Sequence, residues 1–166
     1  MDNLKIEKVG LEAILLIQEL TMQVWPQTYA NSITEEQIGY MLNMMYSEEA
    51  LIHQLQTGNQ FIVSFFNNLP VGFASYGKTE NPNEYKLHKH YVLTTAQKTG
   101  AGKAMLWYVM DEVKKLGCNH LVLQVNYKNK NAIGFYERMG FLKEQEADFD
   151  IGNGYYMNDY VMGIKF

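Results

Sequence analysis

The sequence predicts an α/β domain with a mixed, mostly antiparallel sheet of about six or seven strands. Segments with strand-like apolar runs and segments with apolar residues at helical spacing both recur along the chain. Short connections between strands, one before and one after the helix expected from Gly100, favour antiparallel hairpins. One strand–helix–strand unit between them requires a parallel pair, because its long connection must cross the sheet.

The chain has 166 residues, which fits one domain spanning residues 1–166. It is 47% hydrophobic and 19% charged, a composition typical of a globular rather than a disordered protein. The net charge of −4 argues against nucleic acid as a partner, since proteins that bind nucleic acid usually carry a basic face. Mild acidity leaves room for a cationic substrate.

Neither a membrane span nor a secretion signal is expected. No apolar run approaches the roughly 18 residues that a membrane-spanning helix needs, and the N-terminus lacks the apolar core of a signal peptide. We therefore expect a cytoplasmic protein without a membrane partner. Cys118 is the only cysteine, so no disulfide can form within the chain, and its thiol is expected to be buried and structural.

The first part of the chain is expected to be helical after a short strand near Lys5–Lys8. Apolar residues repeat at helical spacing over Leu11–Trp25, and Pro26 is expected to end this helix because proline inside a helix removes a hydrogen bond. Thr34–Gln37 has the pattern of a capping box, in which each end residue binds the backbone N–H of the other, so a second helix begins there. A third, shorter helix is expected over Ser47–Gln56.

The rest of the chain alternates strands and helices. Asn67 and Asn68 form the expected turn between its first two strands, and Gly140 stands where a left-handed helix cap belongs. The expected strands are Gln60–Phe66, Val71–Gly77, Tyr85–Leu93, His120–Val125, Lys143–Ile151 and Tyr155–Ile164, with helices at Gly100–Leu116 and Asn131–Met139. The residues of the first of these helices expected to face the core are Ala104, Leu106, Trp107, Met110 and Val113.

The segment Gln97–Lys103 joins a predicted strand to a predicted helix and has the composition of an anion-binding loop. Gly100 and Gly102 allow an anionic group to approach the backbone, and the helix N-terminus offers unpaired N–H groups with a partial positive charge. Lys98 and Lys103 add positive charge. The sequence therefore predicts a phosphate site here, with a plain tight turn as the alternative.

Two well-known phosphate loops do not match this segment. A Walker A loop would need glycine at position 97 and serine or threonine at position 104, where the chain has Gln97 and Ala104. A dinucleotide fingerprint that begins at Gly100 would need glycine where Met105 stands. Neither motif therefore accounts for the loop.

Two segments together resemble the GNAT superfamily of N-acetyltransferases. Gln97-x-x-Gly100-x-Gly102 is similar to the Gln/Arg-x-x-Gly-x-Gly/Ala signature of that superfamily. Asn129–Phe141 is similar to its second shared segment, and the two occur in the expected order with a helix and a strand between them. The surroundings of Gln97 also look somewhat like those of bacterial polyamine N-acetyltransferases.

The resemblance implies the GNAT fold, with helices on both faces of a twisted sheet and a splayed parallel strand pair. It also implies acetyl-CoA as cosubstrate and no metal. The free edge of the splayed strand, at His90, Tyr91 and Val92, would bind the pantetheine arm, and an N–H near Val92 would polarise the thioester carbonyl. Asn129 would bind the cofactor arm. The loop residues that would hold the diphosphate are Gln97, Lys98, Thr99, Gly100, Ala101, Gly102 and Lys103.

The resemblance further implies the catalytic groups. The Tyr136 hydroxyl would act as general acid toward the sulfur as CoA leaves, the alternative being a core aromatic. Some members of the superfamily have a glutamate near the positions of Gln124 or His88 as the base, whereas this chain has no carboxylate there. His88 lies beside the expected reaction centre and titrates in a suitable range, so it is the candidate base, with a water chain as the alternative.

The acceptor is expected to bind between the first two helices and the last hairpin. Trp25 and Tyr29 lie near that place and are candidate substrate-binding residues, with a role as core anchors as the alternative. Three acids of the last two strands could attract a cation: Asp148, Asp150 and Asp159. Three methionines of the second helix are expected to pack within the helical layer: Met41, Met44 and Met45.

These features predict an N-acetyltransferase that moves the acetyl group of acetyl-CoA to the primary amine of a small molecule by direct attack in a ternary complex. A polyamine is one option for that small-molecule amine substrate. A protein N-terminus or lysine is the alternative acceptor, and a non-catalytic acyl-CoA-binding domain is the alternative function. The joint presence of Gly100, Gly102, Asn129 and Tyr136 argues against loss of catalysis. A homodimer is left open.

Overall fold

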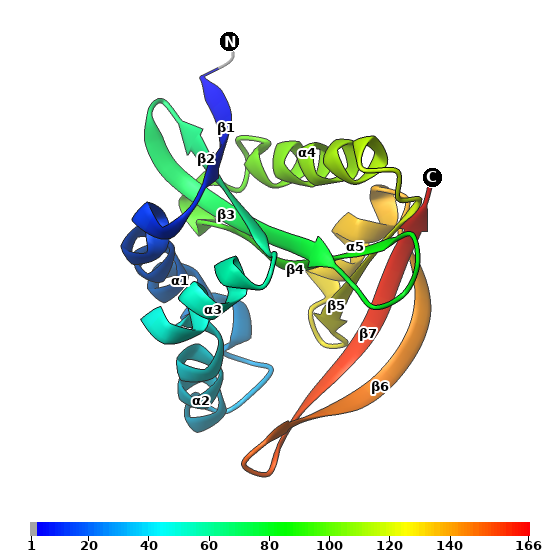
Figure 1. Cartoon of the computed structure of the whole chain (residues 1–166). Helices are drawn as coiled ribbons and strands as arrows, with labels where there is room; N and C mark the ends of the chain where they lie inside the picture. Colours follow the sequence, from blue (N-terminus) through cyan, green and yellow to red (C-terminus); the bar gives the residue numbers. More distant parts are fainter. Residues whose placement is uncertain (1–2) are drawn as a thin grey trace.

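One seven-stranded sheet runs through residues 3–166, the part of the chain that the computed structural model describes (Figure 1). Its strands lie in the order β1-β2-β3-β4-β5-β7-β6, and β4–β5 is parallel whereas the other neighbouring pairs are antiparallel. The mixed sheet expected from the sequence is confirmed. The strands are β1 (Leu4–Val9), β2 (Gln60–Phe66), β3 (Leu69–Lys78), β4 (Glu84–Val92), β5 (His120–Asn126), β6 (Leu142–Gly152) and β7 (Tyr155–Lys165).

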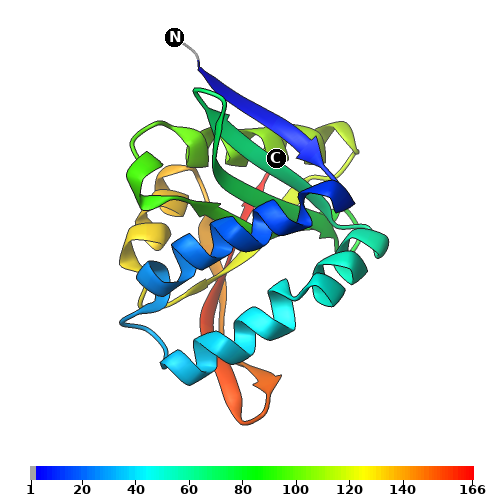
Figure 2. The same cartoon turned by 90° about the vertical axis from the view of Figure 1, so that its left-hand side faces the viewer.

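Helices cover both faces of this sheet, as expected. The first three helices lie on one face, where the earliest of them crosses the front of Figure 2, and the last two lie on the other face. No helix within residues 3–166 is long and apolar enough to cross a membrane. The helices are α1 (Ile14–Tyr29), α2 (Glu35–Tyr46), α3 (Glu48–Gln56), α4 (Ala101–Lys115) and α5 (Lys130–Arg138), with short 3-10 helices at Leu11–Ala13 and Thr94–Ala96.

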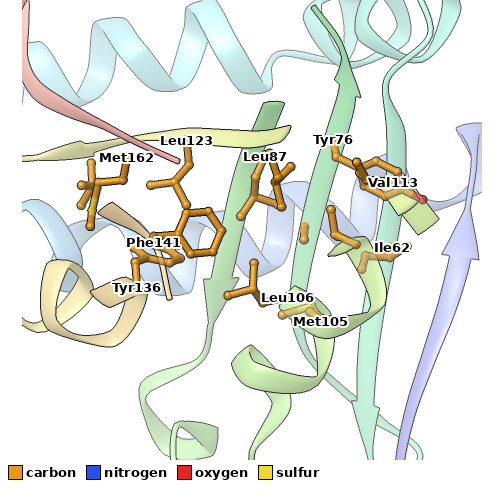
Figure 3. Packing of buried hydrophobic residues seen from close by; sticks show 14 of the residues in the cluster. Ile62, Tyr76, Leu87, Met105, Leu106, Val113, Leu123, Tyr136, Phe141 and Met162 are labelled. Carbon is orange, nitrogen blue, oxygen red and sulfur yellow. The ribbon is translucent and has the colours of Figure 1, made fainter. Parts of the chain in front are cut away.

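Strand β2 shows how one sheet supports two hydrophobic cores. Its side chains alternate between the faces, so Phe61 and Val63 pack under α1–α3 while Ile62 packs under α4. All three are fully buried, which accounts for the continuous apolar run in this part of the sequence. Figure 3 shows part of the second core, where Leu106 of α4 and Phe141 lie among side chains of the sheet.

Pro26 does not end α1, contrary to expectation. The helix continues through it to Tyr29. The carbonyl group that loses its donor belongs to Met22, which is 61% exposed, so water can replace the missing hydrogen bond. Trp25, next to the proline, is 1% exposed, and its burial anchors the last turn of the helix in the core.

The core face of α4 is rotated relative to the expected one. Leu106 and Val113 are buried, as expected, but Trp107 is 54% exposed and the Lys103 ammonium lies 4.8 Å from the centre of its ring. Helical spacing places the tryptophan away from the face that points to the sheet. The residues that are buried are Ala101, Met105, Leu106, Val109 and Val113.

Only half of the expected capping box forms at the start of α2. Thr34 Oγ1 accepts the Gln37 N–H at 3.1 Å, as expected. The Gln37 side chain does not reach back to Thr34. Its Nε2 instead donates to the Tyr156 carbonyl oxygen at 2.8 Å, and this hydrogen bond ties α2 to β7.

Three smaller predictions are confirmed. Asn67 and Asn68 form the turn between β2 and β3 with φ values of 52° and 66°, and Gly140 follows α5 with a φ of 101°. Positive φ suits asparagine and glycine better than other residues. Cys118 is buried and unpaired among the described residues.

Strand β4 contains a bulge at His88. Its register with β3 shifts between Ser75 and Tyr76, so His88 has no partner across the two strands. The pairing of β4 with β5 ends at the same level, at Leu87 and Leu123, although β4 itself continues. The two parallel strands therefore splay apart, as expected, and the second half of β4 has one edge without a neighbouring strand.

The bulge also changes which face each later residue of β4 points to. Leu87 packs in the core under α4, and His90 also points to that side, although their odd spacing would place them on opposite faces of a regular strand. Lys89 and Tyr91 point instead to the α1–α3 side, where they contact aromatic rings. One extra residue in the strand thus determines which face each later side chain of β4 occupies.

Candidate active site

Two cavities meet where β4 and β5 separate. The larger cavity, with a volume of about 730 Å³, lies along the second half of β4, the loop before α4 and the start of α5. The smaller cavity, of about 370 Å³, lies between the α1–α3 layer and the β6–β7 hairpin. The residues that line both cavities form the junction between them: Tyr29, Leu87, His88, Tyr91, Gln124 and Asn126.

The larger cavity brings together most of the residues predicted to bind the cofactor. Thr99 and Ala101 are the exceptions. Thr99 Oγ1 donates to the Ala96 carbonyl oxygen at 2.6 Å, and Ala101 is fully buried beneath the loop, so these two residues shape the loop from inside. The predicted residues that line the cavity are His90, Tyr91, Val92, Gln97, Lys98, Gly100, Gly102, Lys103 and Asn129.

The loop before α4 presents backbone N–H groups to this cavity. Gly100 has a φ of 86°, and the hydrogen-bond ladder of α4 begins with the Ala104 N–H, which donates to the Gly100 carbonyl oxygen at 2.9 Å. The N–H groups of Gly102 and Lys103 therefore have no acceptor within the helix. A side chain at Gly102 would contact Val92 at 3.4 Å, which would narrow this end of the cavity. These features suit a diphosphate.

His90 and Tyr136 form a hydrogen-bonded pair in the wall of the larger cavity. His90 Nε2 lies 2.8 Å from the Gly102 carbonyl oxygen, and Nδ1 lies 2.8 Å from the Tyr136 hydroxyl. A carbonyl oxygen only accepts, so Nε2 carries the proton. Burial lowers the pKa of His90 to about 4, so the ring is neutral at pH 7 and Nδ1 accepts the Tyr136 proton. Burial raises the pKa of Tyr136 above its ordinary value, so the hydroxyl stays protonated.

Asn129 caps α5. Its Oδ1 accepts the Ala132 N–H at 3.2 Å, which satisfies one of the unpaired donors at the start of that helix. The side chain also lines the larger cavity, where its NH₂ group is the part left for a ligand. Tyr136 follows two helical turns later on roughly the same face, so the cap helps to fix the position of the tyrosine.

His88, the bulged residue of β4, lies at the junction and lines both cavities. Solvent reaches its side chain, but the cavity walls displace part of its surrounding water. This loss of water, together with the positive charges of Lys86 and Lys89, keeps the pKa of His88 below its ordinary value. The ring is therefore neutral at pH 7 and able to accept a proton.

Aromatic side chains form the wall of the smaller cavity toward α1. The rings of Trp25 and Tyr29 have centres 4.6 Å apart, and the hydroxyls of Tyr29 and Tyr91 lie 2.9 Å apart. Trp25 and Tyr29 thus belong to the hydrophobic core and line the cavity at the same time. Met41 and Met45 also line the cavity, in addition to the packing expected of them.

Two lysines and one aspartate line the smaller cavity: Lys86, Lys89 and Asp159. Asp159 is 3% exposed, and burial raises its pKa to about 6, although Gln124 Nε2 donates to its carboxylate at 3.3 Å. The Lys86 ammonium donates to Oε1 of the same Gln124, which therefore bridges Lys86 and Asp159. Lys89 is 7% exposed, and burial lowers its pKa to about 8.

Sequence reasoning placed two acids wrongly near the acceptor and missed Lys86 and Lys89. Asp148 and Asp150 are exposed and do not line the smaller cavity. Lys89 stands between two predicted site residues, but regular alternation would have turned it to the α4 side, and the bulge reverses that. Within residues 3–166, no group of three or more His, Cys, Asp or Glu side chains is arranged to hold a metal ion.

The splayed strands, the loop before α4 and the α5 segment all lie within a region shared with one family. The sequence model of the acetyltransferase (GNAT) family matches residues 18–141, which is more than half of the chain. The chain belongs to the GNAT family. It is accordingly an acetyl-CoA-dependent N-acetyltransferase, and the fold expected from the sequence resemblance is confirmed.

Full-length relatives of this GNAT enzyme include the spermidine N(1)-acetyltransferase of Thermoplasma acidophilum, 25% identical over 169 residues that cover 99% of this chain and 98% of the relative. The crystal structure of the PaiA N-acetyltransferase of that organism, in complex with coenzyme A, is similar with a TM-score of 0.84 at 25% identity, covering 100% of both chains. The ribosomal-protein-S18-alanine N-acetyltransferase of Escherichia coli shares the fold, with a TM-score of 0.74 at 18% identity over 98% of this chain and 93% of the other.

Proposed function

We propose that this GNAT enzyme transfers the acetyl group of acetyl-CoA to the primary amine of a small molecule, by direct attack in a ternary complex within one domain spanning residues 1–166. The junction of the two cavities carries the proposal. The larger cavity suits CoA, the smaller one suits an amine, and both open at the splayed end of β4. Holding both substrates at one junction favours direct attack over a covalent acetyl-enzyme.

CoA would lie along the larger cavity. Its pantetheine arm would follow the free edge of β4 at His90–Val92, and its diphosphate would accept hydrogen bonds from the N–H groups of Gly102 and Lys103. Lys98 lines the same end of the cavity and adds positive charge. An N–H near Val92 would polarise the thioester carbonyl and stabilise the oxyanion that forms on attack.

His88 would accept the proton of the amine. An ammonium has no lone pair, so the acceptor must lose a proton before or during attack. His88 is neutral at pH 7, lies at the junction and reaches solvent, which would take the proton away. Asp159 in the smaller cavity would attract the ammonium form first, since a carboxylate with a pKa of about 6 is ionised at pH 7.

Tyr136 would donate a proton to the CoA sulfur as it leaves. Its hydroxyl donates to His90 in the structure, so the acid role includes a change of hydrogen-bond partner from His90 to the CoA sulfur. Rotation about the bond between ring and oxygen is enough to redirect the proton. His90 would position the tyrosine without meeting the reacting atoms.

The smaller cavity favours a small molecule over a polypeptide. Its volume of about 370 Å³ lies at the low end of ligand sites, and the β6–β7 hairpin forms one of its walls. A polyamine is a specific candidate, supported by the name of the T. acidophilum relative and by the presence of Asp159 in the lining. A protein N-terminus would need an open groove for the chain that follows it.

A panel of primary amines with acetyl-CoA, read by release of free CoA thiol, tests the proposal. We expect one or more small amines to be acetylated, with the product identified by mass spectrometry. A protein that binds CoA tightly but acetylates no amine in the panel would instead support the non-catalytic alternative. Peptides with free N-termini or lysines, run in parallel, test the polypeptide alternative.

A further inference from the structure

We infer that the smaller cavity recognises an acceptor that carries a carboxylate as well as a primary amine, and that Lys89 binds the carboxylate. The inference rests on the proposed function, because it specifies the acceptor of the same transfer. The molecule that fits is amino-acid-like, with an amine, a carboxylate and an apolar body, and it differs in charge from a polyamine.

Among the residues that the structure describes, Lys89 is a buried cation without an anionic partner. It is 7% exposed, and its ammonium lies 4.4 Å from the centre of the Tyr46 ring. Within residues 3–166, no carboxylate oxygen lies within 4.0 Å of that ammonium. A buried ammonium has lost much of its water and is strongly favoured to gain an anionic partner. Because Lys89 lines the smaller cavity, a ligand there can supply that partner.

Trp25 lines the same wall and brings no charge to it. Its indole N–H is buried and interacts with the Tyr46 hydroxyl, without a hydrogen bond of regular geometry. Its ring centre lies 5.5 Å from that of Tyr46, the ring over which the Lys89 ammonium lies. The Gln54 amide oxygen has no hydrogen-bond partner among the described residues, but it is uncharged and leaves the excess of positive charge unchanged.

The charges that face the cavity come from two strands. Strand β4 contributes Lys86, Lys89 and the neutral His88, and β7 contributes Asp159, whereas α1–α3 and β6 contribute no charged residue to the described lining. Lys86 and Asp159 are bridged by Gln124, and the lining as a whole has two ammonium groups against one carboxylate. This excess of positive charge favours an anion and repels a purely cationic acceptor.

The positions of these groups match the two ends of such a molecule. Asp159 bonds to Gln124 and pairs with Asn126 in the β5–β7 ladder, and both of these partners line the junction. Lys89 lines the smaller cavity but not the larger one. An amine near Asp159 therefore lies at the junction, where the thioester is expected, while the carboxylate lies on Lys89. Ile33 and Met157 line the space left for the apolar body.

Matched acids and amides test the inference. The pairs are phenylalanine and phenylalaninamide, methionine and methioninamide, and 5-aminopentanoate and 5-aminopentanamide, with spermidine assayed beside them. kcat/KM is measured by thiol release for the wild type, Lys89→Met and Lys143→Met. Lys143 is the matched control, because its ammonium also lies 4.4 Å from a tyrosine ring centre, that of Tyr160, but it is exposed and outside the cavity.

We expect the wild type and Lys143→Met to prefer the acid of at least one pair by about tenfold or more, as a charge-assisted hydrogen bond predicts. Lys89→Met should lose that preference through a fall in kcat/KM for the acid, and its affinity for CoA should not change because Lys89 does not line the larger cavity. Lys89→Arg retains the positive charge, so it should keep much of the preference for the acid over the amide. This variant shows that the loss in Lys89→Met comes from the missing charge and not from a folding defect.

Equal use of acid and amide by the wild type, or an acid preference that survives in Lys89→Met, would overturn the inference. A clear preference for spermidine would also overturn it and leave the proposed function intact. Acid binding to the CoA-bound protein is measured separately by calorimetry. The wild type could bind the acid but acetylate none of the amines, while Lys89→Met does not bind the acid. That result would support the carboxylate site at Lys89 and contradict the proposed function.

Discussion

Tyr136 donates its hydroxyl proton to Nδ1 of His90 across 2.8 Å, while Nε2 of the same ring donates to the Gly102 carbonyl oxygen across 2.8 Å. One imidazole therefore links α5, β4 and the start of α4. His90 thereby fixes the position of Tyr136, the proposed acid, relative to Gly102 in the proposed phosphate loop. A displacement of Tyr136 or of Gly102 would therefore also displace the other through His90.

Tyr136→Phe removes only the hydroxyl. We expect kcat to fall about 100-fold with little change in the KM for acetyl-CoA, because general acid catalysis contributes roughly 10²–10⁴-fold and a CoA thiolate leaves fairly well unaided. His90 Nδ1 then loses its donor in a buried place, so the free energy of unfolding should fall by about 1–3 kcal/mol. Steady-state kinetics and thermal unfolding measure the two effects.

The comparison variant for this test is Tyr136→Ala, which also removes the ring. If Tyr136 were a packing residue alone, Tyr136→Phe would turn over normally and Tyr136→Ala would be impaired. Full activity in Tyr136→Phe would end the general-acid assignment.

Gly100→Val should abolish CoA binding. The added side chain would project into open space where the diphosphate is proposed to lie, and it would also strain a backbone with a φ of 86°. Gly117→Val separates the two effects, because Gly117 has a φ of 82° and equally open surroundings but lies beyond the other end of α4. We expect similar losses of stability in both variants and a loss of CoA affinity by calorimetry in Gly100→Val alone. A folded Gly100→Val protein that binds CoA with unchanged affinity would contradict the assignment of this loop as the diphosphate site.

The pH dependence of kcat/KM separates the two groups that could handle the amine proton. A base must be deprotonated to act, so activity should rise with pH through its pKa. If His88 is the base, the pH profile of kcat/KM should rise below pH 6.5, and His88→Ala should remove this rise and lower the rate at neutral pH. Asp159→Asn should leave the rise in place. If Asp159 takes the proton, the rise near pH 6 should vanish in Asp159→Asn instead. A profile unchanged in both variants would assign the proton to water.

Lys89→Met should stabilise the protein at pH 7. The pKa of Lys89 falls from 10.5 to about 8 on folding, so the unfolded chain binds the proton more strongly than the folded one. The resulting cost is fully present below pH 8 and decreases as pH rises from about 8 to 10.5. Removing the ammonium should therefore raise the free energy of unfolding by about 1–3 kcal/mol at pH 7. Thermal unfolding measures this, and a lower Tm for Lys89→Met at pH 7 would contradict a desolvated, unpaired lysine.

Local chemistry accounts for what the sequence predicted well. The alternation of strand and helix patterns, the turn at Asn67 and Asn68, the left-handed cap at Gly140 and the loop that opens α4 depend on short stretches of chain, and all appear in the structure near their expected positions. Local rules failed where tertiary packing outweighs them. The core holds α1 together past Pro26, and Gln37 bonds to Tyr156 of β7 in place of its own helix N-terminus.

The sequence by itself therefore determined the order of elements, the position of the loop that opens α4 and the place of Tyr136 on α5, because each depends on residues close together in the chain. Only the tertiary structure decided which side chains meet at the site. The bulge at His88 directs His90 toward Tyr136 and Lys89 toward the smaller cavity, and a bulge depends on pairing with β3, which no local pattern in β4 records. A shift of one residue in a strand exchanges the two faces of the sheet, so the charge of the smaller cavity depends on that single register change.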